Sequence, residues 1–313
     1  MLKICLSGNG YGEHHFSQLA TKGFEVIHKP EHLSERELQI SLPDYDAYIL
    51  GGDERLTEPV LKHASKLRVI SFVGTGSSSF IDEVSAKKYN IAVKNTPAVM
   101  APAVAEHTIG LLLGVQRKLF QYNSQIKNHS IQSCITDELS SLCIGIIGMG
   151  EIGSRISKIL RQAFGSKVIY YSRTRKTPLE TDLNLTYVSL ENIFSTADVI
   201  IFAIPTNAET EYFVNDNLLA KAKPGVIIIN TAGARLIDPH ALKKYIDNNI
   251  IAAAALDGYY IEPLPTVAED PFHLLSLPDS RFIITPHVAA KTRQSWQRMI
   301  DMAVNNAIHF FAE

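Results

Sequence analysis

A glycine pattern near the middle of the chain has the spacing that binds the phosphates of a nucleotide. It follows the apolar run CIGII, precedes a stretch with helical periodicity, and reads Gly148-Met149-Gly150-Glu151-Ile152-Gly153. In this context the first glycine permits a tight turn, the second lets the backbone approach a pyrophosphate, and the third allows close helix–strand packing. The amino end of the helix offers free N–H groups and a partial positive charge. We therefore expect residues 148–153 to bind a dinucleotide cofactor.

The choice between NAD(H) and NADP(H) depends on the residue about 20 positions after such glycines, where NAD enzymes place Asp or Glu. This chain has Ser172-Arg173-Thr174-Arg175-Lys176 there. The segment carries no carboxylate to repel a 2′-phosphate. Ser172 can hydrogen-bond that phosphate, and Arg173 or Arg175 can pair with it through two parallel donors. The pattern favours NADP(H), with NAD(H) possible, and the alternative is a solvated basic turn.

A second glycine cluster follows the first apolar run, with the spacing GxGxG, and reads Gly8-Asn9-Gly10-Tyr11-Gly12. No acidic residue ends the next strand, which runs into Val26-Ile27-His28-Lys29-Pro30. The cluster therefore predicts a tight turn more strongly than a second nucleotide site. His14 and His15 are adjacent, so we expect their side chains to point different ways and to form no metal site.

Short apolar runs alternate with amphipathic stretches along most of the chain. Runs that are apolar on both faces and joined by helices predict parallel sheets covered on two sides, an α/β architecture. The candidate strands are Lys3–Leu6, Ala47–Leu50, Val69–Val73, Cys143–Ile147, Lys167–Tyr171, Val199–Ile204, Val226–Asn230, Ile251–Leu256 and Phe282–Thr285.

Three long helices are predicted over residues 103–117, 151–164 and 292–311, and the polar segment 123–141 is predicted to be an irregular connector. The breakers Pro97 and Pro102 precede the first of these helices. A domain boundary is therefore expected near residue 98, and a second crossing near residue 289 would return the chain to the first domain.

Length and composition narrow the class of protein. A chain of 313 residues suggests two domains at roughly 100–200 residues each. A net charge of −2 with both signs scattered argues against a nucleic-acid surface. No apolar run approaches the roughly 18 residues of a membrane helix, so no membrane partner is expected. Three separate cysteines, Cys5, Cys134 and Cys143, predict core packing in a reducing cytoplasm and neither zinc nor disulfides.

Several further motifs occur in a specific order along the chain. They are Val104-Ala105-Glu106-His107, the glycine turn, IPTNAET with Pro205, LAKAKPGVIIINTA, Ala255-Leu256-Asp257 followed by Glu262-Pro263-Leu264-Pro265, and Ile284-Thr285-Pro286-His287. Together they resemble the D-2-hydroxyacid dehydrogenase family, and glyoxylate and hydroxypyruvate reductases in particular. The resemblance covers nearly the whole chain and is weakest over residues 1–70 and 118–138.

The resemblance implies both a fold and a reaction. A flavodoxin-like substrate domain would comprise residues 1–98 and 289–313, and a Rossmann domain of residues 99–288 would be inserted into it. The active site would lie in the cleft between them, and members are usually dimers joined through the cofactor domains. The implied reaction is hydride transfer between NADP(H) and a small 2-keto or 2-hydroxy acid.

The resemblance also assigns roles to individual residues. His287 matches the family's acid/base histidine, and an imidazole suits that role because it titrates near neutrality. Glu262 lies five residues after Asp257 and matches the carboxylate that favours the imidazolium and fixes its tautomer. Asp257 would accept a hydrogen bond from the nicotinamide carboxamide. The remaining implied contacts are Thr75 and Gly76 to the substrate carboxylate, and Pro205, Thr231 and Ala232 to the cofactor.

The chain departs from the family pattern in two places. The segment Ser77–Asp82 carries one extra residue in the substrate-carboxylate loop. The family's catalytic arginine lies three residues after an Asn, but three residues after Asn230 this chain has Gly233, and Arg235 stands two positions later. That arginine normally binds the carboxylate and polarises the carbonyl. Arg235 can replace it through a changed loop, or the substrate can differ, or catalysis can be weak.

The sequence is therefore compatible with two functions, one of an enzyme and one of a binding protein. The first is an active NADP(H)-linked reductase of a small 2-keto acid, supported by His287 and Glu262. The second is a catalytically impaired dinucleotide-binding sensor or regulator, supported by Gly233. A formate-dehydrogenase-like activity is less expected, because that relative would carry Gln in place of Glu262. No phosphate-binding cluster stands near residues 72–82, which disfavours a phosphorylated substrate.

Overall fold

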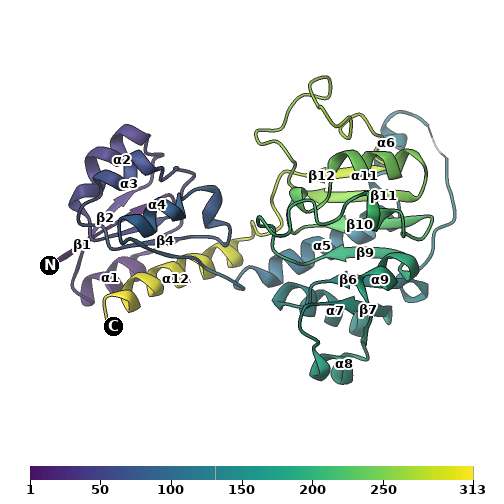
Figure 1. Cartoon of the computed structure of the whole chain (residues 1–313), viewed down its shortest axis with the longest axis horizontal. Coiled ribbons are helices and arrows are strands. Elements are labelled where there is room, and N and C mark those ends of the chain that lie inside the picture. The colour runs from purple at the N-terminus through teal and green to yellow at the C-terminus, as the bar shows by residue number, and fades with distance from the viewer. Residues whose placement is uncertain (131, 313) are drawn as a thin grey trace. The chain divides into compact units, whose positions relative to one another are not determined.

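The chain forms two compact units. The computed structural model describes residues 1–130 and 132–312. One unit comprises Met1–Met100 and Thr292–Glu313, and the other comprises Ala101–Lys291. We call them the terminal unit and the central unit. In Figure 1 the purple start and the yellow end of the chain both belong to the terminal unit.

The terminal unit contains a parallel sheet of five strands in the order β2-β1-β3-β4-β5. Its strands are β1 (Leu2–Ser7), β2 (Phe24–Lys29), β3 (Ala47–Leu50), β4 (Val69–Phe72) and β5 (Ala92–Lys94). This order is that of flavodoxin-like folds, as the sequence predicts. Its helices are α1 (Glu13–Thr21), α2 (Glu35–Ser41), α3 (Glu58–His63), α4 (Glu83–Lys88) and α12 (Arg293–Phe310).

Alternating side chains of the strands fill two cores, one on each face of this sheet. Ile4 and Leu6 pack with Met299 and Ile300 of α12 on one face. Cys5 points to the other face, into a core that also holds residues of α2, α3 and α4. Helix α12 lies beside α1 (Figure 1), so the end of the chain covers a sheet that its beginning forms.

The central unit contains a parallel sheet of seven strands in the order β12-β11-β10-β9-β6-β7-β8. Its strands are β6 (Cys143–Ile147), β7 (Lys167–Tyr171), β8 (Thr186–Tyr187), β9 (Val199–Phe202), β10 (Val226–Asn230), β11 (Ile251–Asp257) and β12 (Phe282–Thr285). The strand order reverses between β6 and β9, which is the switch point at which doubly wound sheets bind nucleotides. The predicted α/β fold class, with a Rossmann unit and a flavodoxin-like unit, is confirmed.

Helices cover both faces of the larger sheet. One face packs against α5 (Ala101–Gln116), α7 (Glu151–Phe164) and α8 (Thr177–Leu183). The other packs against α9 (Leu190–Thr196), α10 (Asp216–Leu219) and α11 (Pro239–Asp247). Apolar side chains on both faces of β6 and β9 therefore lie in core, which explains their continuous apolar sequences.

Some sequence predictions were wrong. Helix α6 (Leu119–Lys127) occupies part of the segment predicted to be irregular, and Ile131 of that segment lies outside the described residues. Cys134 is exposed and not in a core, whereas Cys5 is buried and Cys143 partly buried. The strand candidates did not include β5 and β8, which lie at sheet edges. The strand expected to run into residues 26–30 is the edge strand β2.

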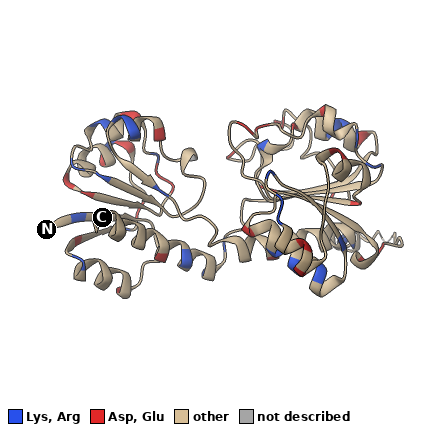
Figure 2. Cartoon of the chain, turned by 60° about the horizontal axis from the view of Figure 1, so that its bottom comes forward, with Lys and Arg blue, Asp and Glu red and all other residues tan. Residues whose placement is uncertain are grey.

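Positions of both charge signs are interspersed along the ribbon of each unit in Figure 2. Across residues 1–130 and 132–312, the helices lack the combined length and apolar character needed to cross a bilayer.

Candidate active site

The glycine turn after β6 has the geometry that its sequence predicts. Gly148 has a φ of +102°, and a Cβ there would lie 2.5 Å from the Ala203 carbonyl oxygen. A Cβ on Gly153 would lie 2.0 Å from the Gly148 carbonyl oxygen, so helix α7 packs directly on the turn. Gly150 faces open space, with nothing within 4 Å of its Cβ position. Two glycines are thus required by packing and the third leaves room for a ligand, which fits a bound pyrophosphate.

The other candidate cofactor residues lie at the same edge of the sheet. Ser172 follows β7, Pro205 follows β9, Thr231 and Ala232 follow β10, and Asp257 ends β11. Because all these strands are parallel, their carboxyl ends lie at one edge, where ligands bind in open α/β sheets. Thr231 is fixed by a 2.8 Å hydrogen bond between its hydroxyl and that of Thr108 on α5.

The two arginines of the basic loop after β7 differ in whether they form an ion pair. Arg175 donates two hydrogen bonds of 2.8 Å to Glu180. These bonds hold the pKa of Glu180 down at about 2, with a further contribution from the Tyr170 hydroxyl. Arg173 is exposed and, among the described residues, forms no ion pair. Ser172 is partly buried. The loop therefore offers one uncompensated guanidinium, although its sequence contains two.

His287 and Glu262 lie together in the central unit. The distance between His287 Nδ1 and Glu262 Oε1 is 3.4 Å, and both side chains are exposed. His287 has a φ of +53°, which is uncommon outside glycine. Gly258 lies beside the pair, with its Cβ position 3.4 Å from Glu262 Oε1 and 3.5 Å from His287 Cγ. A side chain at position 258 would thus contact both partners.

Asp257 has a positioning role that sequence reasoning missed. Its carboxylate is buried and accepts hydrogen bonds from Thr285 Oγ1 at 2.6 Å, Val288 N at 2.9 Å and Ala289 N at 2.7 Å. His107 Nε2 of α5 lies 3.1 Å from Thr285 Oγ1. Asp257 therefore holds the chain on both sides of His287 and stabilises its unusual backbone conformation. The signal available in sequence was a carboxylate that ends an otherwise apolar strand.

Gly233 and Arg235 occupy a loop that begins at the end of β10. Asn230 stabilises this loop by donating from Nδ2 to the Gly233 carbonyl and accepting from the Ala232 N–H. Gly233 has a φ of +132°, and a Cβ there would lie 2.5 Å from Thr206 Oγ1. Arg235 is exposed, with Nη1 3.5 Å from Glu211 Oε1. Such an exposed ion pair is weak, so the guanidinium can exchange partners at little cost.

In the terminal unit, Thr75 and Gly76 belong to an exposed loop that follows β4. Asn95 Nδ2 donates to the Thr75 carbonyl at 3.2 Å, and the Thr96 N–H donates to the Gly74 carbonyl at 2.8 Å. Gly76 has nothing within 4 Å of its Cβ position. The loop is thus held by hydrogen bonds from residues 95 and 96, and the space beside Gly76 is free of atoms of the described residues.

The glycine cluster after β1 is a packed turn, as predicted. A Cβ on Gly8 would lie 2.3 Å from the Gly51 carbonyl oxygen, and one on Gly10 would lie 2.5 Å from the Trp296 ring nitrogen. Both glycines are therefore required by the close packing of this turn.

The expectation that His14 and His15 point different ways was wrong. Their ring centroids lie 3.8 Å apart, and both Nε2 atoms approach Asp301 Oδ1, at 3.8 and 2.8 Å. Successive helical residues are only about 100° apart, so both can reach one acceptor. However, the Gly12 N–H donates to His15 Nδ1 at 3.0 Å, which places the ring proton on Nε2. A metal ion at Nε2 would require the other tautomer, so this cluster does not fit a metal site.

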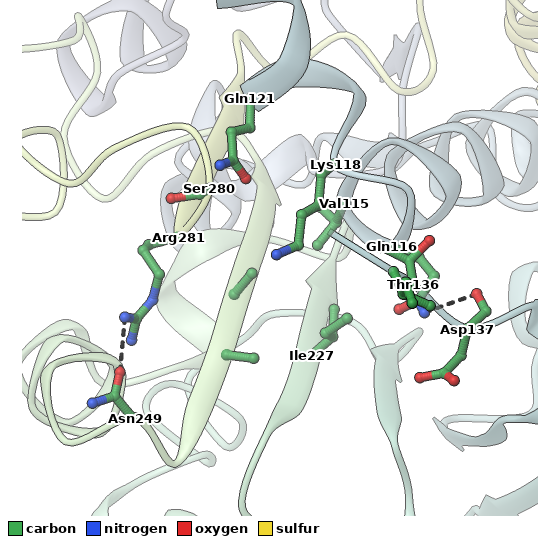
Figure 3. A pocket seen from close by; sticks show the side chains of 13 residues that line it. Val115, Gln116, Lys118, Gln121, Thr136, Asp137, Ile227, Asn249, Ser280 and Arg281 are labelled. Atoms are coloured by element: carbon green, nitrogen blue, oxygen red, sulfur yellow. Dashed lines mark hydrogen bonds between the residues drawn. The ribbon is translucent and has the colours of Figure 1, made fainter. Parts of the chain in front are cut away.

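The central unit also contains a cavity of about 470 Å³. Figure 3 shows Lys118, Gln121 and Arg281 among its lining side chains, with Arg281 hydrogen-bonded to Asn249. Ile227, Ala252 and Arg281 lie at the amino ends of β10, β11 and β12, respectively. The cavity is therefore at the sheet edge opposite the glycine turn, and it is not the dinucleotide site.

Comparisons with known proteins agree with this geometry. Residues 109–289 match the family model "D-isomer specific 2-hydroxyacid dehydrogenase, NAD binding domain". A hydroxypyruvate reductase of Thermotoga maritima is 33% identical over 285 residues, covering 90% of each chain. A glyoxylate reductase of Pyrococcus furiosus is 31% identical, over 91% of this chain and 85% of the relative. A D-lactate dehydrogenase of Lactobacillus jensenii, solved with NAD+, is similar with a TM-score of 0.78 and 27% identity, covering 99% of this chain and 96% of that one.

Proposed function

Because the chain belongs to the D-isomer specific 2-hydroxyacid dehydrogenase family, we propose that it transfers a hydride between NADP(H) and a small 2-keto or 2-hydroxy acid. The observation that carries the proposal is the His287–Glu262 pair, which joins a proton donor to a carboxylate at 3.4 Å. In this proposal the central unit binds the cofactor and carries the acid/base pair. The terminal unit contributes the loop at Thr75 and Gly76 to the substrate carboxylate.

The geometry of the pair suggests which atom moves the proton. Glu262 faces His287 Nδ1, so Nε2 is the atom left to serve the substrate. Bound NADPH supplies the hydride to the carbonyl carbon of the keto acid. The carbonyl oxygen takes its proton from Nε2, and the neutral imidazole keeps its other proton on Nδ1, towards Glu262. In the direction of oxidation, Nε2 takes the proton back.

The proposed cofactor contacts are divided among backbone and side chains at one sheet edge. Residues 148–153 would hold the pyrophosphate through N–H groups at the start of α7. Pro205, Thr231, Ala232 and Asp257 would line the nicotinamide end. Preference for NADP(H) over NAD(H) is supported by the absence of an acidic residue at positions 172–176 and by the exposed Arg173.

The substrate carboxylate needs a positive partner, because an unpaired anion in a closed site is costly. We assign this role to Arg235. Gly233, at the position of the family's arginine, has a backbone conformation and a neighbour, Thr206, that leave no room for a side chain. Arg235 is the next cation along the loop, and its exposed contact with Glu211 is readily exchanged.

A homodimer is also part of the proposal. The apolar residues Leu119, Phe120 and Ile126 of α6 and Ile135 are all exposed, at 55%, 37%, 62% and 101%. Such a group of exposed large apolar side chains is typical of an association surface. Light scattering should give the mass of two chains, and replacing Leu119 and Ile126 by Glu should give the mass of one. A single-chain mass for the unmodified protein would contradict this part.

The second candidate function is a dinucleotide-binding sensor with little turnover. The observation that favours it is the exposed position of Arg235 and its pairing with Glu211 instead of with a site residue. A sensor would bind NADPH but would reduce no keto acid.

A panel of 2-keto acids with NADPH separates these functions. Glyoxylate, hydroxypyruvate, pyruvate and longer keto acids are mixed with protein and reduced cofactor, and the loss of NADPH absorbance is followed. The enzyme function predicts turnover with at least one small acid and none with the His287→Gln variant. Binding of NADPH without turnover of any acid would contradict the enzyme and favour the sensor.

A further inference from the structure

The loop between β7 and α8, residues 172–176, is fixed by two tyrosines. The Tyr170 hydroxyl accepts a hydrogen bond from the Lys176 N–H at 2.7 Å and donates one to Glu180 Oε1 at 2.7 Å. The Tyr187 hydroxyl donates to the Ser172 carbonyl at 3.4 Å. Both ends of the loop are thus held by groups of the protein itself, and its backbone is positioned before a ligand arrives.

Of the two arginines in this loop, one is neutralised by a carboxylate and the other is not. Arg175 directs Nε and Nη2 at the two oxygens of Glu180, 2.8 Å each, and its guanidinium lies 5.6 Å from the centre of the Tyr187 ring. This two-point geometry is the strong form of a guanidinium–carboxylate pair. The Glu180 carboxylate, paired at this distance, cancels the charge of Arg175, and the same contacts lower the pKa of Glu180 to about 2.

Arg173 stands two residues before Arg175 and is exposed. Within the part of the chain that the structure describes, no carboxylate lies within ion-pair distance of it. Ser172 precedes it directly at the end of β7, where the ribose of a bound dinucleotide is recognised. Arg173 and the Ser172 hydroxyl lie next to this position and can therefore meet a 2′-phosphate without first breaking an ion pair. Lys176, the third cation of the loop, lies at its far end, next to α8.

We propose that Glu180 is a specificity-determining residue, which neutralises Arg175 and leaves Arg173 to bind the 2′-phosphate. This inference rests on the proposed preference for NADP(H). Glu180 limits that preference, because it cancels one of the three positive charges of the loop, which also contains Lys176. Arg175 in turn screens the Glu180 carboxylate. Without Arg175, that carboxylate would repel a 2′-phosphate, as the acidic residue of NAD enzymes does.

The test is a set of dissociation constants for NADPH and NADH, measured by calorimetry without substrate. Arg173→Ala should weaken NADPH binding about tenfold or more and leave NADH binding unchanged, because a charge-assisted contact is lost. Glu180→Gln should tighten NADPH binding about two- to fivefold, the effect of freeing one exposed charge. Arg175→Ala should weaken NADPH binding, and the double variant Arg175→Ala/Glu180→Gln should recover to within about twofold of the unmodified protein.

A matched control removes a paired carboxylate elsewhere on the central unit. Glu191 on α9 lies 3.5 Å from Lys221, on the sheet face opposite α8, and Glu191→Gln should change neither constant. The NADH constant serves as the internal reference for folding, since a misfolded variant would lose both cofactors.

The outcomes distinguish this inference from the cofactor preference itself. Weaker NADPH binding by Glu180→Gln, or no recovery in the double variant, would overturn the inference by showing that Arg175 binds the phosphate directly. If the unmodified protein bound both cofactors equally, the preference would be wrong. In that case, a preference for NADPH that appeared in the Glu180→Gln variant would still support the role of Glu180. If this variant also bound both cofactors equally, the inference about Glu180 would be overturned together with the cofactor preference.

Discussion

Glu262 and His287 face each other beside Gly258, with 3.4 Å between the carboxylate oxygen Oε1 and the imidazole nitrogen Nδ1. The pair is exposed, so this contact alone contributes little to stability. Its value lies in orientation, because a ring held at Nδ1 directs Nε2 away from the carboxylate. Each residue can therefore be changed with little risk to folding.

His287→Gln should lower kcat by about 10²–10⁴-fold, because the proton donor is lost while a hydrogen-bonding side chain remains. The dissociation constant for NADPH should stay within about twofold. Glu262→Gln should have a smaller effect on kcat, since glutamine keeps an acceptor for Nδ1 but no charge. Steady-state rates and cofactor titrations check both variants. An unchanged rate in His287→Gln would show that another group donates the proton.

Gly258→Ala should lower both stability and rate. The backbone at this position has a φ of +91°, which costs a residue with a Cβ about 1–2 kcal/mol. The new methyl group would lie in ordinary van der Waals contact with Glu262 and His287, at 3.4 and 3.5 Å, so the loss of rate would come from the strained backbone beside the pair. Chemical denaturation measures the first effect and kcat the second. Gly165→Ala at the end of α7 has a similar φ of +67° with open space around its Cβ position, so it should lower stability alone.

Asp257→Asn should reduce the free energy of unfolding by about 1–3 kcal/mol and lower kcat. Its Oδ1 accepts hydrogen bonds from Thr285 and Val288 and its Oδ2 accepts one from Ala289, so an amide NH2 at the Oδ2 position would face the Ala289 N–H. The backbone around His287 should then exchange its amide hydrogens faster. Unaltered exchange at residues 285–289 would contradict the positioning role of Asp257.

Arg235→Ala should cost about 2–4 kcal/mol in kcat/KM, the usual range for one preorganised donor. Glu211→Gln should leave kcat/KM unchanged or raise it, because the guanidinium loses a competing partner. Gly233→Arg should not restore an ordinary family site, since its φ of +132° and the proximity of Thr206 strain any side chain there. If Arg235→Ala were without effect on an active enzyme, the carboxylate partner would lie elsewhere.

One thiol should react much faster than the other two. Hydrogen bonds from Tyr122 and Lys118 lower the pKa of the exposed Cys134. Burial raises the pKa of Cys5 to about 12 and also raises that of Cys143. Alkylation at neutral pH, followed by peptide mass analysis, should modify Cys134 first, because the thiolate is the reactive form. Labelling of Cys5 at a comparable rate would contradict the burial of β1.

Strands buried on both faces were the easiest elements to predict from sequence. Residues 143–147 and 226–230 are continuous apolar runs, and the structure has strands with those bounds. The two strands that the sequence did not reveal, β5 and β8, lie at the edge of a sheet, and so does β2, whose bounds were not predicted from the sequence. An edge strand is only half covered, so residues such as Glu25 and Lys94 interrupt its apolar pattern.

Helix α6 was missed for a related reason. It has no buried residues in the structure, and its apolar side chains are exposed. Without a buried stripe, the segment lacks the periodicity that marks a helix. The Arg175–Glu180 pair was equally hidden, because it connects a loop to a helix across five positions, a spacing that no regular element produces. The order of motifs was enough to predict the family, whereas contacts such as the Arg175–Glu180 pair could be identified only in the structure.

The return of the chain to its first sheet has a consequence for synthesis on the ribosome. Ile4, Leu6, Ala47 and Ile49 emerge early, yet α12, which packs in the same core, is made only after all of residues 101–291. At about 5–20 residues per second, this wait is on the order of ten to forty seconds. During that time α1 covers only part of this apolar sheet face, so the nascent chain should bind chaperones through its earliest segment while the central unit is already folding.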